Sequence, residues 1–158
     1  ATNKQAPVAL SALIYDGLGY THQGWLTEDQ AYFVVDDELD ELDNGHTTRT
    51  RVFDVSDPAN PNLVGFYEAE TAAVDHNLYI VHDLVYMANY RSGLRILALD
   101  DPSTASLSEV GFFDTVPADD LAEFAGAFTA YPFFESGVVV VSSMEEGLFV
   151  LRPQLPGS

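Results

Sequence analysis

Short apolar runs alternate with turn residues along the whole chain, and this pattern predicts a protein built from β-strands. Runs such as AYFVVDD (31–37), LVYMANY (84–90) and GVVVVSS (137–143) are rich in the β-branched and aromatic side chains that favour a half-buried pleated surface. Gly, Asn, Asp and Pro separate the runs and are typical of turns. No segment has a convincing helical period, and ADDLAEFAGAF (118–128) would form one turn at most.

The strands recur in a fixed order, so the chain contains an internal repeat. RVFDVSDP (51–58) is matched by RILALDDP (95–102), and GLRIL (93–97) is matched by GLFVL (147–151). Each repeat spans about 44 to 54 residues and holds four short strands, which is typical of a β-propeller blade. We therefore predict an all-β fold, a β-propeller built of four-stranded blades.

The strand count predicts about three blades' worth of propeller, which is too few to close a ring of the usual four to eight blades. Twelve strands are expected, including a lone outer strand at VALSALIY (8–15). Further blades on a missing part of the polypeptide would complete the ring, and this is the arrangement we favour. The alternative is a six-bladed ring of two copies, in which each N-terminal strand completes the partner's last blade. The predicted segments are the lone strand of a preceding blade (1–19), blade one (20–70), blade two (71–116) and blade three without its outer strand (117–158).

The chain is strongly acidic, with 25 Asp and Glu against 6 Lys and Arg and a formal charge of −19. Such a field repels nucleic acids and attracts cations, so nucleic acid is not expected as a partner. A soluble or salt-adapted surface is the simplest explanation of the charge. The longest apolar run, GVVVV (137–141), is too short to span a bilayer, and no membrane span is predicted. The absence of cysteine excludes thiolate catalysis and cysteine zinc sites.

Six of the carboxylates lie in one stretch, between Asp36 and His46, where blade one connects its second and third strands. This connection is about nine residues longer than its counterpart in blade two, and insertions in repeats often mark a binding face. Flexible acidic loops supply the oxygen ligands that Ca²⁺ prefers, which makes calcium the candidate cofactor. The alternative is a solvated, mobile surface. The candidate metal ligands are Asp36, Asp37, Glu38, Asp40 and Asp43.

A second group of polar residues is expected at the same rim of the propeller. His22 and His76 open the first strands of blades one and two, and they suit either a ligand pocket or a transition metal. The alternative is that both hydrogen-bond neighbouring backbone in a repeated structural role. Arg51 and Arg95 are expected to pair with carboxylates between blades. The candidate ligand-binding residues are His22, His76, Asn89, Tyr90 and Arg91.

Five stretches are spread along the chain: YTHQGWLTED (20–29), RVFDVSDPANP (51–61), DHNLYI (75–80), YRSGLRIL (90–97) and GLFVLRP (147–153). They resemble the LVIVD-repeat propellers, in particular the bacterial surface proteins of the choice-of-anchor B family. The resemblance covers nearly the whole chain and implies an exported protein, located at the cell surface or outside the cell. It also implies that the chain is the C-terminal part of a longer propeller, in line with its start at Ala1 rather than Met. No catalytic residue carries over from the family.

The function predicted from these features is binding at the cell surface by a β-propeller, with a cation that orders its acidic rim. The alternative is a metal-dependent hydrolase or lyase with its site at the central channel. The G-x-S-x-G, H-E-x-x-H and phosphate-binding glycine motifs are absent. The sequence therefore leaves open whether the chain is an enzyme, and it does not name the surface ligand.

Overall fold

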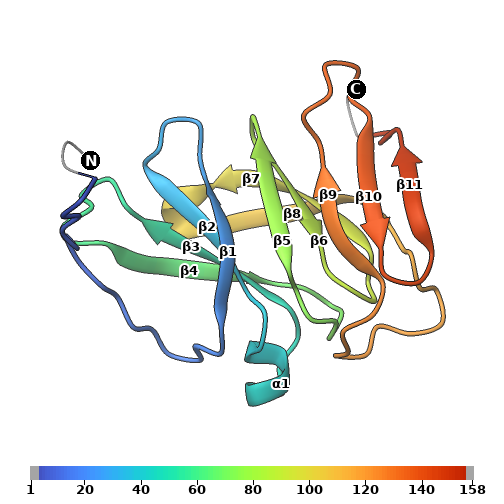
Figure 1. Cartoon of the computed structure of the whole chain (residues 1–158), viewed down its shortest axis with the longest axis horizontal. Coiled ribbons are helices and arrows are strands. Elements are labelled where there is room, and N and C mark those ends of the chain that lie inside the picture. Colours follow the sequence, from blue (N-terminus) through green and yellow to red (C-terminus); the bar gives the residue numbers. More distant parts are fainter. Residues whose placement is uncertain (1–3, 156–158) are drawn as a thin grey trace.

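The computed structural model describes residues 4–155, which form three antiparallel β-sheets (Figure 1). In each sheet the strands follow one another as a meander, as short strands joined by tight turns favour. The first sheet contains β1 (Thr21–Leu26), β2 (Tyr32–Asp37), β3 (Arg49–Asp54) and β4 (Asn62–Glu68). The second contains β5 (Asn77–Val81), β6 (Leu84–Ala88), β7 (Leu94–Asp101) and β8 (Ser106–Phe113). The third contains β9 (Ala127–Tyr131), β10 (Val139–Ser143) and β11 (Gly147–Leu151).

The three sheets stand side by side, and their first strands β1, β5 and β9 are neighbours (Figure 1). Apolar side chains from facing sheets fill the two spaces between them, and this burial is the main source of stability. Val34 and Val52 of the first sheet pack with Leu78 and Met87 of the second. On the other side of the second sheet, a separate core forms against the third from Leu94, Ile96, Ala130, Val139 and Val141, among others.

The predicted all-β class is confirmed, and eleven of the twelve predicted strands are present in the described residues. The expected strand at 8–15 is wrong: this segment forms no strand with any other part of residues 4–155. Four of its apolar side chains, Val8, Leu10, Leu13 and Ile14, are exposed, and the segment forms no ladder with the strands of the described residues. The three sheets lie within segments 20–70, 71–116 and 117–158, and residues 1–3 and 156–158 of the predicted segments lie outside the described residues.

Two short helices accompany the sheets. The first, α1 (Asp40–Asn44), lies in the acidic connection between β2 and β3, where no helix was predicted. It ends at Gly45, whose φ of 71° is the left-handed conformation that closes many helices. The second is the 3-10 turn η1 (Pro102–Thr104). Neither helix, nor any other helix of the described residues, is long and apolar enough to cross a membrane.

Candidate functional site

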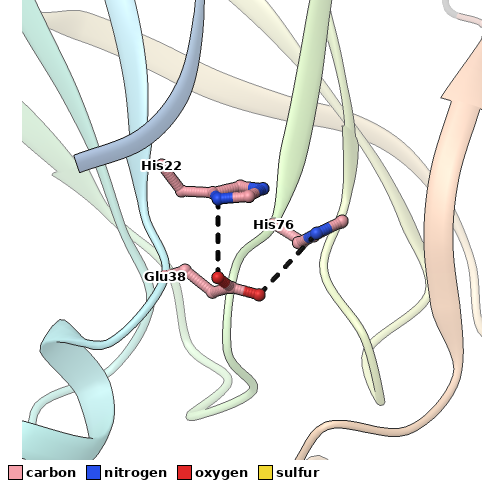
Figure 2. A group of neighbouring side chains, drawn as sticks. All are labelled: His22, Glu38 and His76. Carbon is pink, nitrogen blue, oxygen red and sulfur yellow. Dashed lines mark ion pairs between the residues drawn. The ribbon is translucent and has the colours of Figure 1, made fainter. Parts of the chain in front are cut away.

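The rim cluster, which we define as His22, Glu38, His76 and Tyr90, lies where β1 and β5 begin and where β2 and β6 end. Glu38 lies below and between the two imidazole rings (Figure 2). His22 Nδ1 is 3.5 Å from Glu38 Oε2, and His76 Nε2 is 3.7 Å from Glu38 Oε1. The Tyr90 hydroxyl donates to Glu38 Oε1 at 2.7 Å. One carboxylate therefore holds three side chains from two sheets.

A β-bulge explains how His22 reaches this cluster. The register of β1 against β2 shifts between Thr21 and Gln23, which leaves His22 as the extra residue. A bulge turns its side chain away from the regular alternation of the strand, here toward Glu38. Adjacent antiparallel strands bring Glu38, at the end of β2, back to the start of β1. The approach of His22 to Glu38 thus follows from one extra residue in β1.

Aromatic stacking and burial fix the two histidines. Their rings stack at 4.5 Å between centroids, and His76 also contacts the Phe128 ring at 4.3 Å. His76 Nδ1 lies 2.5 Å from the Phe128 backbone oxygen. This contact matches the alternative given for the histidines, in which they hydrogen-bond neighbouring backbone. Burial lowers the pKa of His76 and raises that of Tyr90, whose hydrogen bond to Glu38 acts in the same direction. We therefore expect a neutral His76 at neutral pH.

The rim cluster is open on the side of His22, whose side chain is 26% exposed. Three exposed aromatic side chains, Tyr20, Phe124 and Phe128, lie around it and contact its rings. A separate hollow of about 580 Å³ lies toward the other ends of β1 and β5, against Trp25, Ile80 and Phe133 among others, and the rim cluster does not line it. The Glu38 carboxylate of the rim cluster is 13% exposed and has aromatic rings around it.

The other two predicted ligand-binding residues lie elsewhere. Asn89 is buried in the turn between β6 and β7, where its backbone carbonyl accepts a hydrogen bond from the Ser92 N–H. The Arg91 guanidinium forms a two-point ion pair with Asp119, at 2.6 Å and 2.8 Å, and a weaker one with Glu123 at 3.4 Å. Arg91 thus fastens the long connection before β9 to the second sheet.

A second group, the buried acidic cluster, consists of Asp36, Asp40, Glu41 and Asp75. Asp36 is the last residue but one of β2, Asp40 and Glu41 begin α1, and Asp75 precedes β5. All four side chains are at most 3% exposed. One carboxylate oxygen each from Asp40, Glu41 and Asp75 lies within 4.8 Å of the others. The acidic connection is therefore folded inward at these residues, rather than forming a wholly solvated loop.

Burial raises the pKa of every carboxyl group in this cluster, and their mutual repulsion raises most of them further. The pKa of Glu41 reaches about 9, because burial and the neighbouring Asp40 both disfavour its ionised form. Arg51 acts in the opposite direction on Asp40. Within the described chain, neither oxygen of Asp36 or of Asp75 accepts a hydrogen bond.

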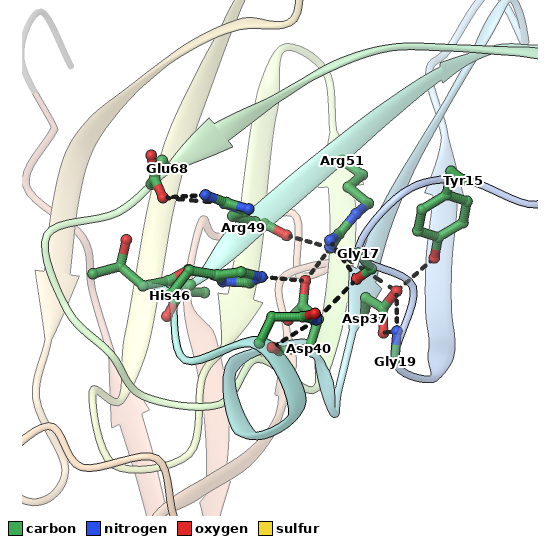
Figure 3. A network of polar contacts seen from close by, with 12 residues as sticks. Tyr15, Gly17, Gly19, Asp37, Asp40, His46, Arg49, Arg51 and Glu68 are labelled. Atoms are coloured by element: carbon green, nitrogen blue, oxygen red, sulfur yellow. Dashed lines mark hydrogen bonds and ion pairs between the residues drawn. The ribbon is translucent and has the colours of Figure 1, made fainter.

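Arg51 and Asp37 belong to a polar network beside the acidic cluster (Figure 3). Arg51 Nη1 contacts Asp40 Oδ2, and Nη2 donates to the Gly17 carbonyl at 3.2 Å. Asp37 accepts hydrogen bonds from the Tyr15 hydroxyl at 2.7 Å and from the Gly19 N–H at 3.0 Å. This network ties the N-terminal segment to α1. The expectation that Arg51 pairs between blades is wrong, because its partner Asp40 belongs to the same unit.

The five predicted metal ligands separate into four environments. Asp36 and Asp40 lie in the buried acidic cluster, and Asp43 is exposed on α1. Asp37 accepts hydrogen bonds from the N-terminal segment, and Glu38 belongs to the rim cluster. Residues 36 and 37 diverge because neighbours on a strand point to opposite faces, as expected. The sequence missed Glu41 and Asp75 as members of the acidic cluster. Asp75 could have been noticed as an acid next to His76, but the repeat gives it no acidic counterpart, since Thr21 precedes His22.

Comparisons with known proteins show a likeness in fold only. No family model matches the chain, and no curated protein matches it. A crystal structure of the computationally designed Ika4 protein is similar over 94% of this chain and 100% of that chain, with a TM-score of 0.50 and 10% sequence identity. At this identity the likeness concerns the fold alone.

Proposed function

We propose that this chain is a binding module of an extracellular or cell-surface protein, and that its ligand contacts the rim cluster. The observation that supports this function best is the position of Glu38 between His22 and His76, next to exposed aromatic side chains. The resemblance to LVIVD-repeat surface proteins of the choice-of-anchor B family supports the location. A binding role requires no catalytic group at the rim cluster. This agrees with the sequence, in which the G-x-S-x-G and H-E-x-x-H motifs are absent.

The chemistry of the rim favours a ligand with a positively charged or hydroxyl-bearing group. Glu38 accepts hydrogen bonds, and aromatic faces attract cations and stack on sugar rings. The formal charge of −19 raises the local concentration of cationic ligands around the whole chain. Basic peptides and amino sugars are therefore the first classes to examine.

We expect Glu38→Gln to weaken ligand binding at least about tenfold, because it removes the charge between the two histidines. The measurement is surface plasmon resonance on the immobilised chain, with a panel of basic peptides and amino-sugar glycans as probes. Glu28→Gln is the matched control, since Glu28 is exposed in the turn between β1 and β2 at the other end of these strands. Equal losses in both variants, or no binding by any probe, would contradict the proposed function.

The proposed parent architecture is a β-propeller of which this chain supplies about three blades. Its support is the order of the sheets, each of which places its first strand beside the first strand of the next. The third sheet has three strands in the described residues, and the apolar segment at 8–15 is exposed. Both features suit blades completed by another polypeptide segment, either from a longer chain or from a second copy.

We expect native mass spectrometry of this chain to give a monomer mass, because the arrangement we favour takes its remaining blades from a longer polypeptide. A dimer mass would instead favour a six-bladed ring of two copies, in which the N-terminal segment of each copy supplies the outer strand that the partner's third blade lacks. Deleting residues 1–15 distinguishes a ring dimer from loose association, since only the former needs the exchanged strand.

A metal-dependent hydrolase or lyase is the second candidate function. It is favoured by one observation: ligand atoms of His22, Glu38 and His76 all lie within 4.8 Å of one another. Two imidazoles and a carboxylate are a ligand set for Zn²⁺ and related metals. Conversion of a bound probe, detected by mass spectrometry and lost in His76→Ala, would favour the enzyme over the binding module.

A further inference from the structure

We propose that the buried acidic cluster is a calcium site, in which Asp40, Glu41 and Asp75 supply the ligands and the buried Asp36 adds negative charge. Its ligands come from two segments: the first turn of α1 and the residue before His76. The inference does not depend on which ligand the rim cluster binds. It also differs from a loop site, because its carboxylates are buried rather than displayed to solvent.

The first argument is the uncompensated charge. Ionised carboxylates are seldom buried without hydrogen-bond donors or a cation, because loss of hydration is costly. Asp36 and Asp75 are both fully buried, and their four oxygens accept no hydrogen bond from residues 4–155. Arg51 contacts Asp40, and His46 Nε2 lies 3.6 Å from the same carboxylate. One guanidinium cannot balance four carboxylates, so a divalent cation fits the remaining charge.

The second argument is the geometry and chemistry of the donors. Two oxygens bound to one Ca²⁺ at 2.3–2.6 Å are separated by at most about 5 Å. The oxygens of Asp40, Glu41 and Asp75 meet this limit, since they lie within 4.8 Å of one another. Carboxylate oxygens are ligands for hard cations, whereas Zn²⁺ favours nitrogen and sulfur. A buried set of carboxylates favours Ca²⁺ over Mg²⁺, which keeps several of its waters.

The third argument is the connection to the rim cluster. Asp75 directly precedes His76, and Asp40 follows Glu38 by two residues. A cation held by Asp40 and Asp75 would fix the segment that follows Glu38 and the segment that carries His76. Calcium is therefore expected to order the rim and to strengthen binding there.

The test is isothermal titration calorimetry of the chelator-treated full chain with CaCl₂, and with MgCl₂ for comparison. We expect one calcium ion per chain and weaker magnesium binding. With calcium at about 100 times its dissociation constant, the melting temperature should rise by about 5 °C or more. No heat of binding and no thermal shift at millimolar calcium would overturn the proposal.

Asp75→Asn is the decisive variant, and Asp43→Asn is its matched control. Both remove one acidic charge, but Asp43 is exposed on α1 while Asp75 is fully buried. Asp75→Asn should weaken calcium binding at least about tenfold, the effect of removing a charged ligand. It should also raise the melting temperature of the calcium-free chain by relieving repulsion, which a misfolded variant would not do. Equal calcium affinities in the two variants would overturn the site.

Discussion

We expect Arg51→Met to lower the free energy of unfolding by about 3 to 5 kcal/mol, the usual cost of leaving one member of a buried ion pair without its partner. Arg51 is 2% exposed in the middle of β3, and its guanidinium contacts the Asp40 carboxylate. Met retains much of the apolar volume of the side chain, so the loss reflects charge rather than a cavity. Urea unfolding followed by circular dichroism, with chelator present, measures the difference.

Arg49→Met is the matched control, because Arg49 lies on the same strand two residues earlier. Arg49 donates to Glu68 Oε1 at 2.8 Å, but Arg49 is partly exposed and Glu68 is exposed, with 25% and 46% of their side-chain surface accessible. Exposed ion pairs contribute about 1 kcal/mol or less. If the two variants are equally destabilised, the buried pair is not the cause. Adding Asp40→Asn to Arg51→Met should recover part of the loss, since it removes the carboxylate left unpaired.

The strands could be predicted well because the side chains that favour a strand form a recognisable pattern within a few neighbouring residues. AYFVVDD (31–37) and LVYMANY (84–90) carry β-favouring side chains, and β2 and β6 form within them. The repeat then placed His22 and His76 at equivalent ends of neighbouring sheets, and their rings stack at 4.5 Å. The segment at 8–15 has the same composition, but a strand also needs a neighbouring edge, which a local pattern cannot supply.

The acidic cluster was only partly predictable, because burial of a carboxylate depends on tertiary packing. Nothing in DDELDELDNG (36–45) distinguishes Asp40, which is fully buried, from Asp43, which is exposed. The distinction comes from α1, whose first turn faces the sheets while the rest faces solvent. Asp75 comes from a different sheet and joins the cluster only when β1 and β5 lie side by side.

We expect the calcium-free chain to become more stable as the pH is lowered from about 8 to about 6.5, by about 2 kcal/mol in the free energy of unfolding. Burial raises the folded-state pKa of Asp36, Asp75 and Glu41, that of Glu41 to about 9. These groups keep their protons in the folded chain at a pH where the unfolded chain has lost them. Their contribution to stability is therefore present at low pH and is lost as the pH rises.

The lower limit of this pH range is set by His76, whose pKa is lowered by burial. Below about pH 6.5 the unfolded chain gains a proton on this histidine that the folded chain resists, which opposes the carboxyl effect. Urea unfolding at several pH values measures the slope. Glu41→Gln should make the slope smaller and Asp43→Asn should leave it unchanged, while a flat profile in the unaltered chain would contradict the raised pKa values.

Saturating calcium should reverse the sign of this dependence. Calcium binds ionised carboxylates, so protons compete with it and the ligands must be deprotonated. The stabilisation by calcium should therefore grow as the pH rises from about 6.5 to about 8. A cluster that only shares protons among its carboxyl groups would show the same pH slope with and without calcium. The reversal thus separates a metal site from a protonated acidic core in a single set of unfolding curves.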